Sequence, residues 1–264
     1  MGDHSPIEWT DATWNPVTGC SKVSAGCENC YAERLANRLQ KWGVARYRNG
    51  FAVTLHPEVL ELPLHWREPR RVFVNSMSDL FHGLVPTSFI DKVFDVMERA
   101  PQHTFQVLTK RPGRMVAYLT GFGARRGNLV RVSAYKGRAV PPNVWLGTSV
   151  EDTRVLDRID HLRRAPGPIR FLSCEPLLGP LPALDLENIN WVIVGGESGP
   201  GHRPIEASWV RDLRRQCRSA KVPFFFKQWG GYTPKAGGRL LDGRTYDGIP
   251  GPRSNGWQIL PAGA

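Results

Sequence analysis

Three cysteines stand close together near the start of the chain, at Cys20, Cys27 and Cys30, with the spacing C-x6-C-x2-C. Thiolates on one short loop can bind a single inorganic centre, and the number three is informative. A closed structural zinc site takes four protein ligands, and an ordinary iron–sulfur cluster also takes four cysteines. Three ligands leave one metal position open for a cofactor or a substrate. The spacing therefore predicts a metal or cluster site with an open coordination position.

Simple burial in the core, or a disulfide, fits these cysteines less well. The residues between them include Ser, Gly, Lys, Glu and Asn, which do not form the apolar run expected around a buried structural cysteine. Residues Met1 to Thr10 lack the basic and apolar regions of a secretory signal. We therefore expect a cytoplasmic protein, and in that compartment clustered cysteines bind metal or take part in catalysis more often than they form disulfides. Cys217 falls in a helical pattern and is expected to pack in the core.

The composition favours a globular protein with a polyanionic partner. The chain has 264 residues, 41% of them hydrophobic, which is enough for a sizeable core. It carries 35 Lys and Arg against 24 Asp and Glu, a formal net charge of +11. Such a charge favours nucleic acid, through phosphate contacts and counterion release. The sequence has no uncharged apolar run of about eighteen residues, so we expect no membrane partner.

Short apolar runs alternate with helical stretches along the chain, and the runs are typical of parallel strands covered on both faces. The expected strands are Arg71–Asn75, Thr104–Leu108, Val144–Gly147, Ile169–Leu172, Trp191–Val194 and Pro223–Phe226, with Phe51–Leu55 as a weaker seventh and Thr13–Val17 as a possible eighth. The expected helices are Cys30–Trp42, Ser88–Arg99, Val150–Arg164 and Ser208–Ala220.

This alternation predicts an α/β fold, a (β/α) barrel that is either complete and TIM-like or partly open. A doubly wound open sheet is the main alternative. We expect one domain over residues 1–264. It contains a polar, glycine-rich insertion at about 121–142 and an irregular C-terminal tail from about 230.

Charged residues follow several of the expected strands, and in a barrel the carboxyl ends of the strands form the active-site mouth. Four carboxylates occupy such positions, with two lysines beside them: Asp79, Glu151, Glu175 and Glu197, then Lys110 and Lys227. Gly195 and Gly196 precede the last carboxylate and allow a backbone to approach a ligand closely. Polar loops meet water in any protein, yet this pattern favours one site. Lys110, Glu151, Glu175 and Lys227 are its candidate catalytic groups.

The cysteine loop and several other motifs resemble those of known families. The segments Asn15-Pro16-Val17-Thr18-Gly19-Cys20 and Cys27-Glu28-Asn29-Cys30-Tyr31-Ala32 are similar to the cluster loop of radical S-adenosylmethionine proteins near spore photoproduct lyase, where the usual spacing is C-x3-C-x2-C. Most of the chain resembles the phage Gp37/Gp68 family (DUF5131), a family of three-Cys-motif proteins. The shared motifs are Phe73–Phe81, Leu108–Pro112, Leu172–Leu177 and Val194–Gly199.

The resemblance implies a [4Fe–4S] cluster on Cys20, Cys27 and Cys30, with its fourth iron open to S-adenosylmethionine. Reductive cleavage of that cofactor would give a 5′-deoxyadenosyl radical, and the protein would position and shield it. The residues that the resemblance suggests for cofactor binding are Tyr31, Asn75, Ser76, Asp79, Gly195, Gly196 and Glu197.

The charge and the cluster-like loop together favour repair or modification of DNA or RNA by radical chemistry. The expected partners are nucleic acid, an electron donor such as a flavodoxin or ferredoxin, and a three-Cys-motif partner protein. An alternative from another class is a non-enzymatic nucleic-acid-binding protein with a structural metal site, in which Glu28, Cys174 or His56 supplies a fourth ligand. A redox cluster that works without S-adenosylmethionine is a third possibility.

Overall fold

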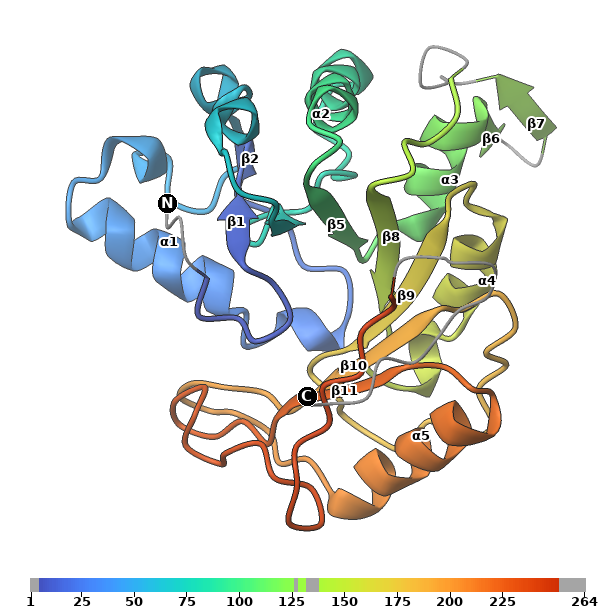
Figure 1. Ribbon diagram of the computed structural model, residues 1–264. Helices are drawn as coiled ribbons and strands as arrows, with labels where there is room; N and C mark the ends of the chain where they lie inside the picture. Colours follow the sequence, from blue (N-terminus) through green and yellow to red (C-terminus); the bar gives the residue numbers. More distant parts are fainter. Residues whose placement is uncertain (1–4, 126–127, 132–137, 252–264) are drawn as a thin grey trace.

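A curled sheet of seven parallel strands forms the centre of the protein, as seen in the computed structural model, which describes residues 5–125, 128–131 and 138–251 (Figure 1). In spatial order the strands are β1 (Ala12–Trp14), β4 (Arg71–Val74), β5 (Thr104–Thr109), β8 (Val144–Ser149), β9 (Ile169–Cys174), β10 (Trp191–Gly195) and β11 (Phe224–Gln228). Every neighbouring pair in this sheet is parallel. All the carboxyl ends therefore lie at one edge of the sheet, where the chain can build a site.

The strands are apolar on both faces because each face is covered by a different layer. Alternate residues such as Val72 and Val192 face outward and pack with apolar side chains of the helices, while Phe73 and Ile193 belong to a second cluster on the concave side. This division follows from the two-residue period of a strand.

Four helices cover the convex face of the sheet: α2 (Thr87–Arg99), α3 (Pro112–Thr120), α4 (Asp157–Arg164) and α5 (Ala207–Ser219) (Figure 1). Each buries an apolar stripe against the strands, and Cys217 of α5 packs there as expected. Helix α1 (Tyr31–Lys41) belongs to a separate small cluster in which Ala32 and Ala36 pack against Met77, a residue beyond the end of β4.

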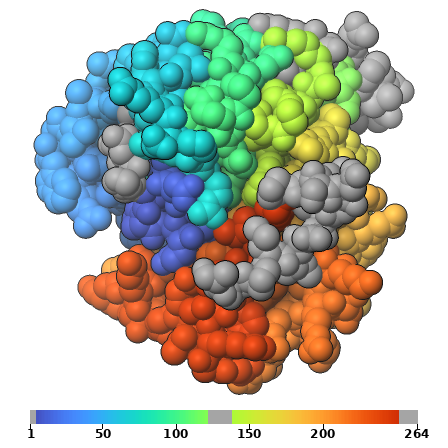
Figure 2. Space-filling view, viewed as in Figure 1, coloured from blue at the N-terminus to red at the C-terminus, as the bar shows by residue number. Residues whose placement is uncertain are grey.

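The concave face is filled by aromatic side chains from both halves of the chain. Trp9, before β1, packs on Phe73 at a centroid distance of 4.7 Å and on Trp191 at 6.1 Å. Trp191 in turn donates a hydrogen bond to the carbonyl of Gly248, 2.7 Å away. Figure 2 shows the result at the surface, where the blue N-terminal segments meet the orange and red C-terminal segments.

The partly open form of the predicted barrel is confirmed, and the complete TIM-like form is wrong. Within the described residues, the edge strands β1 and β11 do not pair with each other, so the sheet does not close. The doubly wound alternative also fails, because such a sheet carries helices on both faces. Here aromatic side chains occupy the concave face.

Two strand predictions need correction. Only Thr54–Leu55 of the expected strand Phe51–Leu55 is extended, as β3, and it pairs antiparallel with β2 (Val17–Thr18) outside the main sheet. The strand expected at Thr13–Val17 divides into β1 and β2, because β1 ends at Trp14. The six clear strands all belong to the sheet.

Helices differ in two places from their expected ranges. Within the stretch Val150–Arg164 the chain forms a short 3-10 turn at Thr153–Val155, and helix α4 then begins only at Asp157. Helix α3 is present although the sequence pattern did not predict a helix there. In the expected insertion, β6 (Phe122–Arg125) and β7 (Asn128–Arg131) form their own antiparallel ribbon. None of the helices in the described ranges has the length and apolar character needed to cross a bilayer.

Candidate functional site

The cysteine loop, residues 19–30, lies over the carboxyl ends of the parallel strands. It begins beyond β2, where Gly19 forms a parallel bridge with Ser78 after β4. Cys27 ends a 3-10 turn at Ala25–Cys27, and Cys30 is the cap residue before α1. All five cysteines of the chain are in described residues and none forms a disulfide.

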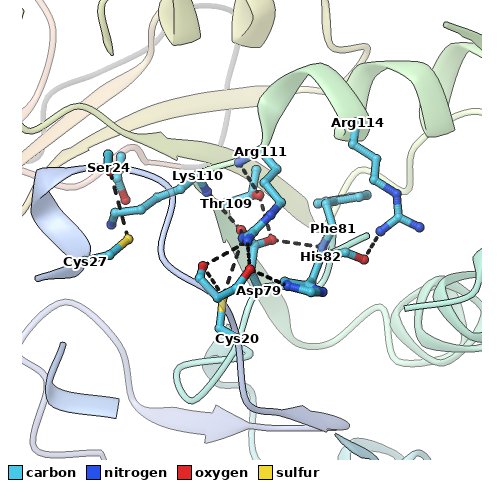
Figure 3. A network of polar contacts seen from close by, with 12 residues as sticks. Cys20, Ser24, Cys27, Asp79, Phe81, His82, Thr109, Lys110, Arg111 and Arg114 are labelled. Carbon is cyan, nitrogen blue, oxygen red and sulfur yellow. Dashed lines mark hydrogen bonds and ion pairs between the residues drawn. The ribbon is translucent and has the colours of Figure 1, made fainter. Parts of the chain in front are cut away.

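Arg111, beyond the end of β5, stands against the first cysteine (Figure 3). Its Nη1 donates to Cys20 Sγ at 3.4 Å and to Asp79 Oδ2 at 2.9 Å, while Nη2 donates to the carbonyl of Ser21 at 3.0 Å. Burial and the negative charge of Asp79 raise the pKa of the Cys20 thiol, and Arg111 opposes them. The guanidinium is therefore the cation positioned to stabilise a thiolate at this cysteine.

Asp79 is buried, and its oxygens all face protein donors. Oδ1 accepts hydrogen bonds from Thr109 Oγ1 at 2.7 Å and from the Phe81 amide at 2.9 Å. Oδ2 accepts from the Lys110 amide at 3.2 Å in addition to Arg111. In this structure Asp79 orients Arg111 toward Cys20, and its predicted direct contact with a cofactor stays a prediction.

His82 supports the same corner of the site. The Leu84 amide donates to His82 Nδ1 at 3.1 Å, so Nε2 carries the proton and donates to Ser21 Oγ at 2.8 Å. Burial, followed by the nearby charge of Arg111, lowers the pKa of His82. The neutral imidazole of His82 therefore holds Ser21, the residue that follows Cys20.

The middle of the cysteine loop contacts Glu151, beyond β8. Ser24 Oγ donates to Glu151 Oε1 at 2.6 Å and lies 4.0 Å from Cys27 Sγ. Glu151 is buried and also pairs with Arg158 Nη1 of α4 at 2.8 Å and with Lys110 Nζ at 3.7 Å. The predicted catalytic residues Lys110 and Glu151 are thus brought together.

Glu197, beyond β10, connects the last part of the loop to the sheet. Its Oε2 accepts from Asn29 Nδ2 at 3.0 Å and from Arg203 Nε at 2.9 Å, and Oε1 accepts from Arg203 Nη2 at 2.5 Å. Burial by itself raises the pKa of Glu197, but the hydrogen bonds from Arg203 and Asn29 hold it below the usual value. Glu197 is therefore ionised and engaged at neutral pH.

Glu175 and Lys227 form a second predicted pair, with 3.2 Å between Oε1 and Nζ. Glu175 follows β9 and Lys227 lies in β11, and β10 runs between these two strands. Gly195 of β10 makes the contact possible, because a Cβ there would stand 2.6 Å from Glu175 Oε1. A Cβ at Gly196 would stand 1.9 Å from the Trp229 carbonyl oxygen. Both glycines meet packing needs, and their contact with a cofactor stays a prediction.

The remaining predicted cofactor residues lie beyond β4. Tyr31 donates a hydrogen bond from its hydroxyl to the carbonyl of Ser76, and its ring is half exposed. Asn75 is buried in the left-handed region at φ 61°, and its Oδ1 accepts from the Val17 amide at 3.2 Å. Among the described residues, Asn75 Nδ2 has no acceptor. A buried amide with an unused donor is a candidate contact for a ligand.

The three candidates for a fourth protein ligand are engaged elsewhere. Glu28 pairs with Arg203 at 2.8 Å. Cys174 is buried in the core between sheet and helices, and His56 is buried between Thr18 and Glu58. Across the described ranges, no group of three His, Cys, Asp or Glu side chains is placed to hold a metal ion.

Several residues that hold the cysteine loop were not found from the sequence: Ser24, Asn29 and Arg203. Arg111 could be singled out from the sequence, because it directly follows an apolar strand. The partners of Ser24 and Asn29 are 127 and 168 residues away in the chain, so no local pattern reveals them.

These features define a class, an open half-barrel of parallel strands with a cysteine loop across their carboxyl ends. The chain belongs to the family described as "Protein of unknown function (DUF5131)", whose model matches residues 4–250. The family resemblance seen in the sequence motifs is therefore confirmed. None of the curated proteins matches the chain.

Two solved structures are similar to it, both of spore photoproduct lyase. One is the enzyme complexed with dinucleoside spore photoproduct, at 11% identity and a TM-score of 0.35, and the other is a mutant of the enzyme at 12% and 0.34. Each match covers 76% of this chain and 59% of that chain.

Proposed function

We propose that this protein is a radical S-adenosylmethionine type enzyme with a [4Fe–4S] cluster, acting on nucleic acid in DNA or RNA repair or modification. The observation that carries the proposal is the position of Cys20, Cys27 and Cys30. The loop that bears them is held over the carboxyl ends of an open parallel half-barrel, where functional groups gather in such folds.

Cys20, Cys27 and Cys30 are not gathered around one point among the described residues, but their chemistry and surroundings fit such a cluster. Three thiols of one loop are free of disulfides and only partly buried. Arg111 donates toward the sulfur of Cys20, which supports a negatively charged ligand there. Cys30 is the N-cap residue of helix α1, and the N-terminus of a helix favours negative charge. A set of three thiolates leaves one iron open for a cofactor.

When bound, the cluster and S-adenosylmethionine would supply one-electron reductive cleavage of the sulfonium. The chain's own residues bind and orient. Asn75 Nδ2 is a buried donor for a carboxylate or carbonyl oxygen of a ligand. Lys110 and Lys227 each have ammonium protons beyond their carboxylate contacts and can hold an anionic group of the substrate or give it a proton from Nζ.

Glu151 and Glu175 are the acceptors beside these lysines. Each keeps an ammonium group at the strand ends and can accept a proton at a carboxylate oxygen. The net charge of +11 supports a nucleic-acid substrate. A cytoplasmic enzyme of this kind needs an electron donor such as a flavodoxin or ferredoxin, and a three-Cys-motif protein is the proposed further partner.

Cysteine variants test the cluster. We expect C20A, C27A and C30A each to retain well under half of the iron and sulfide that the wild-type protein binds on anaerobic reconstitution. C217A is the matched control, since this buried cysteine of α5 lies in the helix-packed core. Iron and acid-labile sulfide are measured together with visible absorption. Equal iron in all four variants would exclude the three-cysteine site. A colourless protein that binds zinc with the same three cysteines would favour the structural alternative.

A further inference from the structure

The residues between the first two cysteines include a turn that sits on one buried carboxylate. Ser24, Ala25 and Gly26 lead into Cys27, and the turn is closed by hydrogen bonds from the Cys27 amide to the Ser24 carbonyl at 2.9 Å and from the Glu28 amide to the Ala25 carbonyl at 3.1 Å. Ser24 Oγ reaches Glu151 Oε1 at 2.6 Å. This is the shortest of the side-chain contacts described for the turn, and it is assisted by a full negative charge.

The carboxylate beneath the turn is held from the other side by helix α4. Glu151 is 1% exposed, and Arg158 Nη1 donates to its Oε2 at 2.8 Å and to the Ser149 carbonyl at 3.0 Å. A buried ion pair with a second hydrogen bond is costly to rearrange. Glu151 is therefore a fixed surface against which the loop must fit.

Gly26 shows how closely the loop fits. A Cβ at this position would stand 2.3 Å from Glu151 Cγ and 2.4 Å from Oε1. Only a residue without a side chain can lie there while Glu151 keeps its place. On the other side of the turn, Arg203 Nη2 donates to the Ala25 carbonyl at 2.9 Å and its Nη1 pairs with Glu28 at 2.8 Å.

We propose that Glu151 is a positioning residue for the cysteine loop and that Ser24–Gly26 is the docking segment it recognises. The six-residue gap after Cys20 then has a physical purpose, because three of its residues form the docked turn that sets where Cys27 stands over β8. The expected effect of this docking on cluster assembly rests on the proposed function. The docking itself is a property of the protein without a cluster.

The first experiment compares S24A with V23A in the full chain without iron. Val23 is an exposed residue of the same loop, so V23A is the matched control. Hydrogen exchange at the amides of Cys27 and Glu28 reports docking directly. Loss of one hydrogen bond to a buried charge predicts exchange that is faster by about tenfold in S24A, with no change in V23A. Equal exchange in S24A, V23A and wild type would overturn the proposal.

The second experiment uses the Gly26 contact. G26A should accelerate exchange of the same amides in the wild-type background and leave it unchanged in the E151A background, where no side chain blocks the new methyl group. A G26A effect of the same size in both backgrounds would contradict the proposed recognition. If E151A does not fold, the comparison of S24A with V23A still tests the proposed docking.

A third measurement links docking to the site. After reconstitution, S24A and G26A should show altered cluster electron paramagnetic resonance spectra, and G26A/E151A should match E151A alone. If no variant and no wild-type protein binds iron while the exchange results hold, the proposed function fails and the docking inference stands. If wild type, S24A and G26A give identical cluster spectra in spite of faster exchange, the docking segment does not position the cysteines.

Discussion

At the scale of single residues, the site is organised by ion pairs that join the cysteine loop to the strand ends. Asp79 has a side chain 6% exposed and holds Arg111, 15% exposed, at 2.9 Å, and Arg111 in turn faces the sulfur of Cys20. Four protein donors meet the two oxygens of this one carboxylate. Asp79 therefore acts on the first cysteine through Arg111.

Replacing Asp79 by Asn should be strongly destabilising. The amide removes the counter-charge of Arg111 and replaces one of the two accepting oxygens by an NH2 group that faces protein donors, a change that costs on the order of 3 kcal/mol in free energy of unfolding. Urea denaturation measures the loss.

The control for this prediction is E61Q, because Glu61 pairs with Arg99 at the surface, where both side chains are more than half exposed. That change should cost less than about 1 kcal/mol. If the D79N variant is as stable as E61Q, the Asp79–Arg111 pair does not hold the site in the way described.

Part of the site could be predicted from the sequence, and the residues that could not be predicted have a physical reason in common. Cys20, Cys27 and Cys30 are marked by their spacing alone, and Lys110 and Glu151 by their position after apolar runs. Ser24 and Arg203 carry no such mark, since their roles depend on partners brought near by the fold. The position of a carboxylate after a strand also does not show whether it faces a ligand or, like Asp79, already accepts hydrogen bonds from protein donors at both oxygens.

At the scale of elements, the two faces of each strand pack against different layers. The outward row packs on the helices, and the concave row fills the half-barrel with aromatic rings. Gly147 of β8 lies against the ring of Phe171 on β9, and a Cβ there would stand 2.3 Å from the ring. The absence of a side chain on β8 is thus what admits the large side chain of its neighbour.

The variant G147A should lose about 1–3 kcal/mol of stability, because the added methyl overpacks the concave face. Thermal unfolding followed by circular dichroism measures the change. G83A is the matched control, since a Cβ at Gly83 meets no atom within 4 Å. An unchanged melting temperature in G147A, or an equal loss in both variants, would contradict this packing.

The length of an apolar run does not separate the strands that were predicted correctly from the one that was not. Trp191–Val194 is continuously apolar and Ile169–Leu172 is apolar except for Arg170, and both are in the sheet. Phe51–Leu55 has similar residues, yet only two of them pair, with the short strand that leads to Cys20. Strand propensity does not specify which partner is within reach.

At the scale of the whole molecule, an open half-barrel and a net charge of +11 are the two features that bear on the substrate. If nucleic acid is the substrate, binding should weaken by at least about tenfold between roughly 50 and 200 mM salt, because phosphate contacts release counterions. Fluorescence anisotropy with labelled single-stranded and duplex oligonucleotides measures it.

Heparin is the control for this binding, because a charge effect alone predicts equal competition by any polyanion. Binding to oligonucleotides that survives a charge-matched excess of heparin supports recognition of the nucleic acid itself. Failure to bind any oligonucleotide at low salt would remove nucleic acid as the substrate.

We propose that Cys20, Cys27 and Cys30 hold a cluster whose open position takes S-adenosylmethionine. The most direct test is electron paramagnetic resonance of the anaerobically reconstituted, reduced full-length protein with and without that cofactor. We expect a [4Fe–4S] signal that shifts when S-adenosylmethionine is added and that is lost in C27A but kept in C217A. A cluster signal indifferent to the cofactor, or no cluster at all, would contradict it.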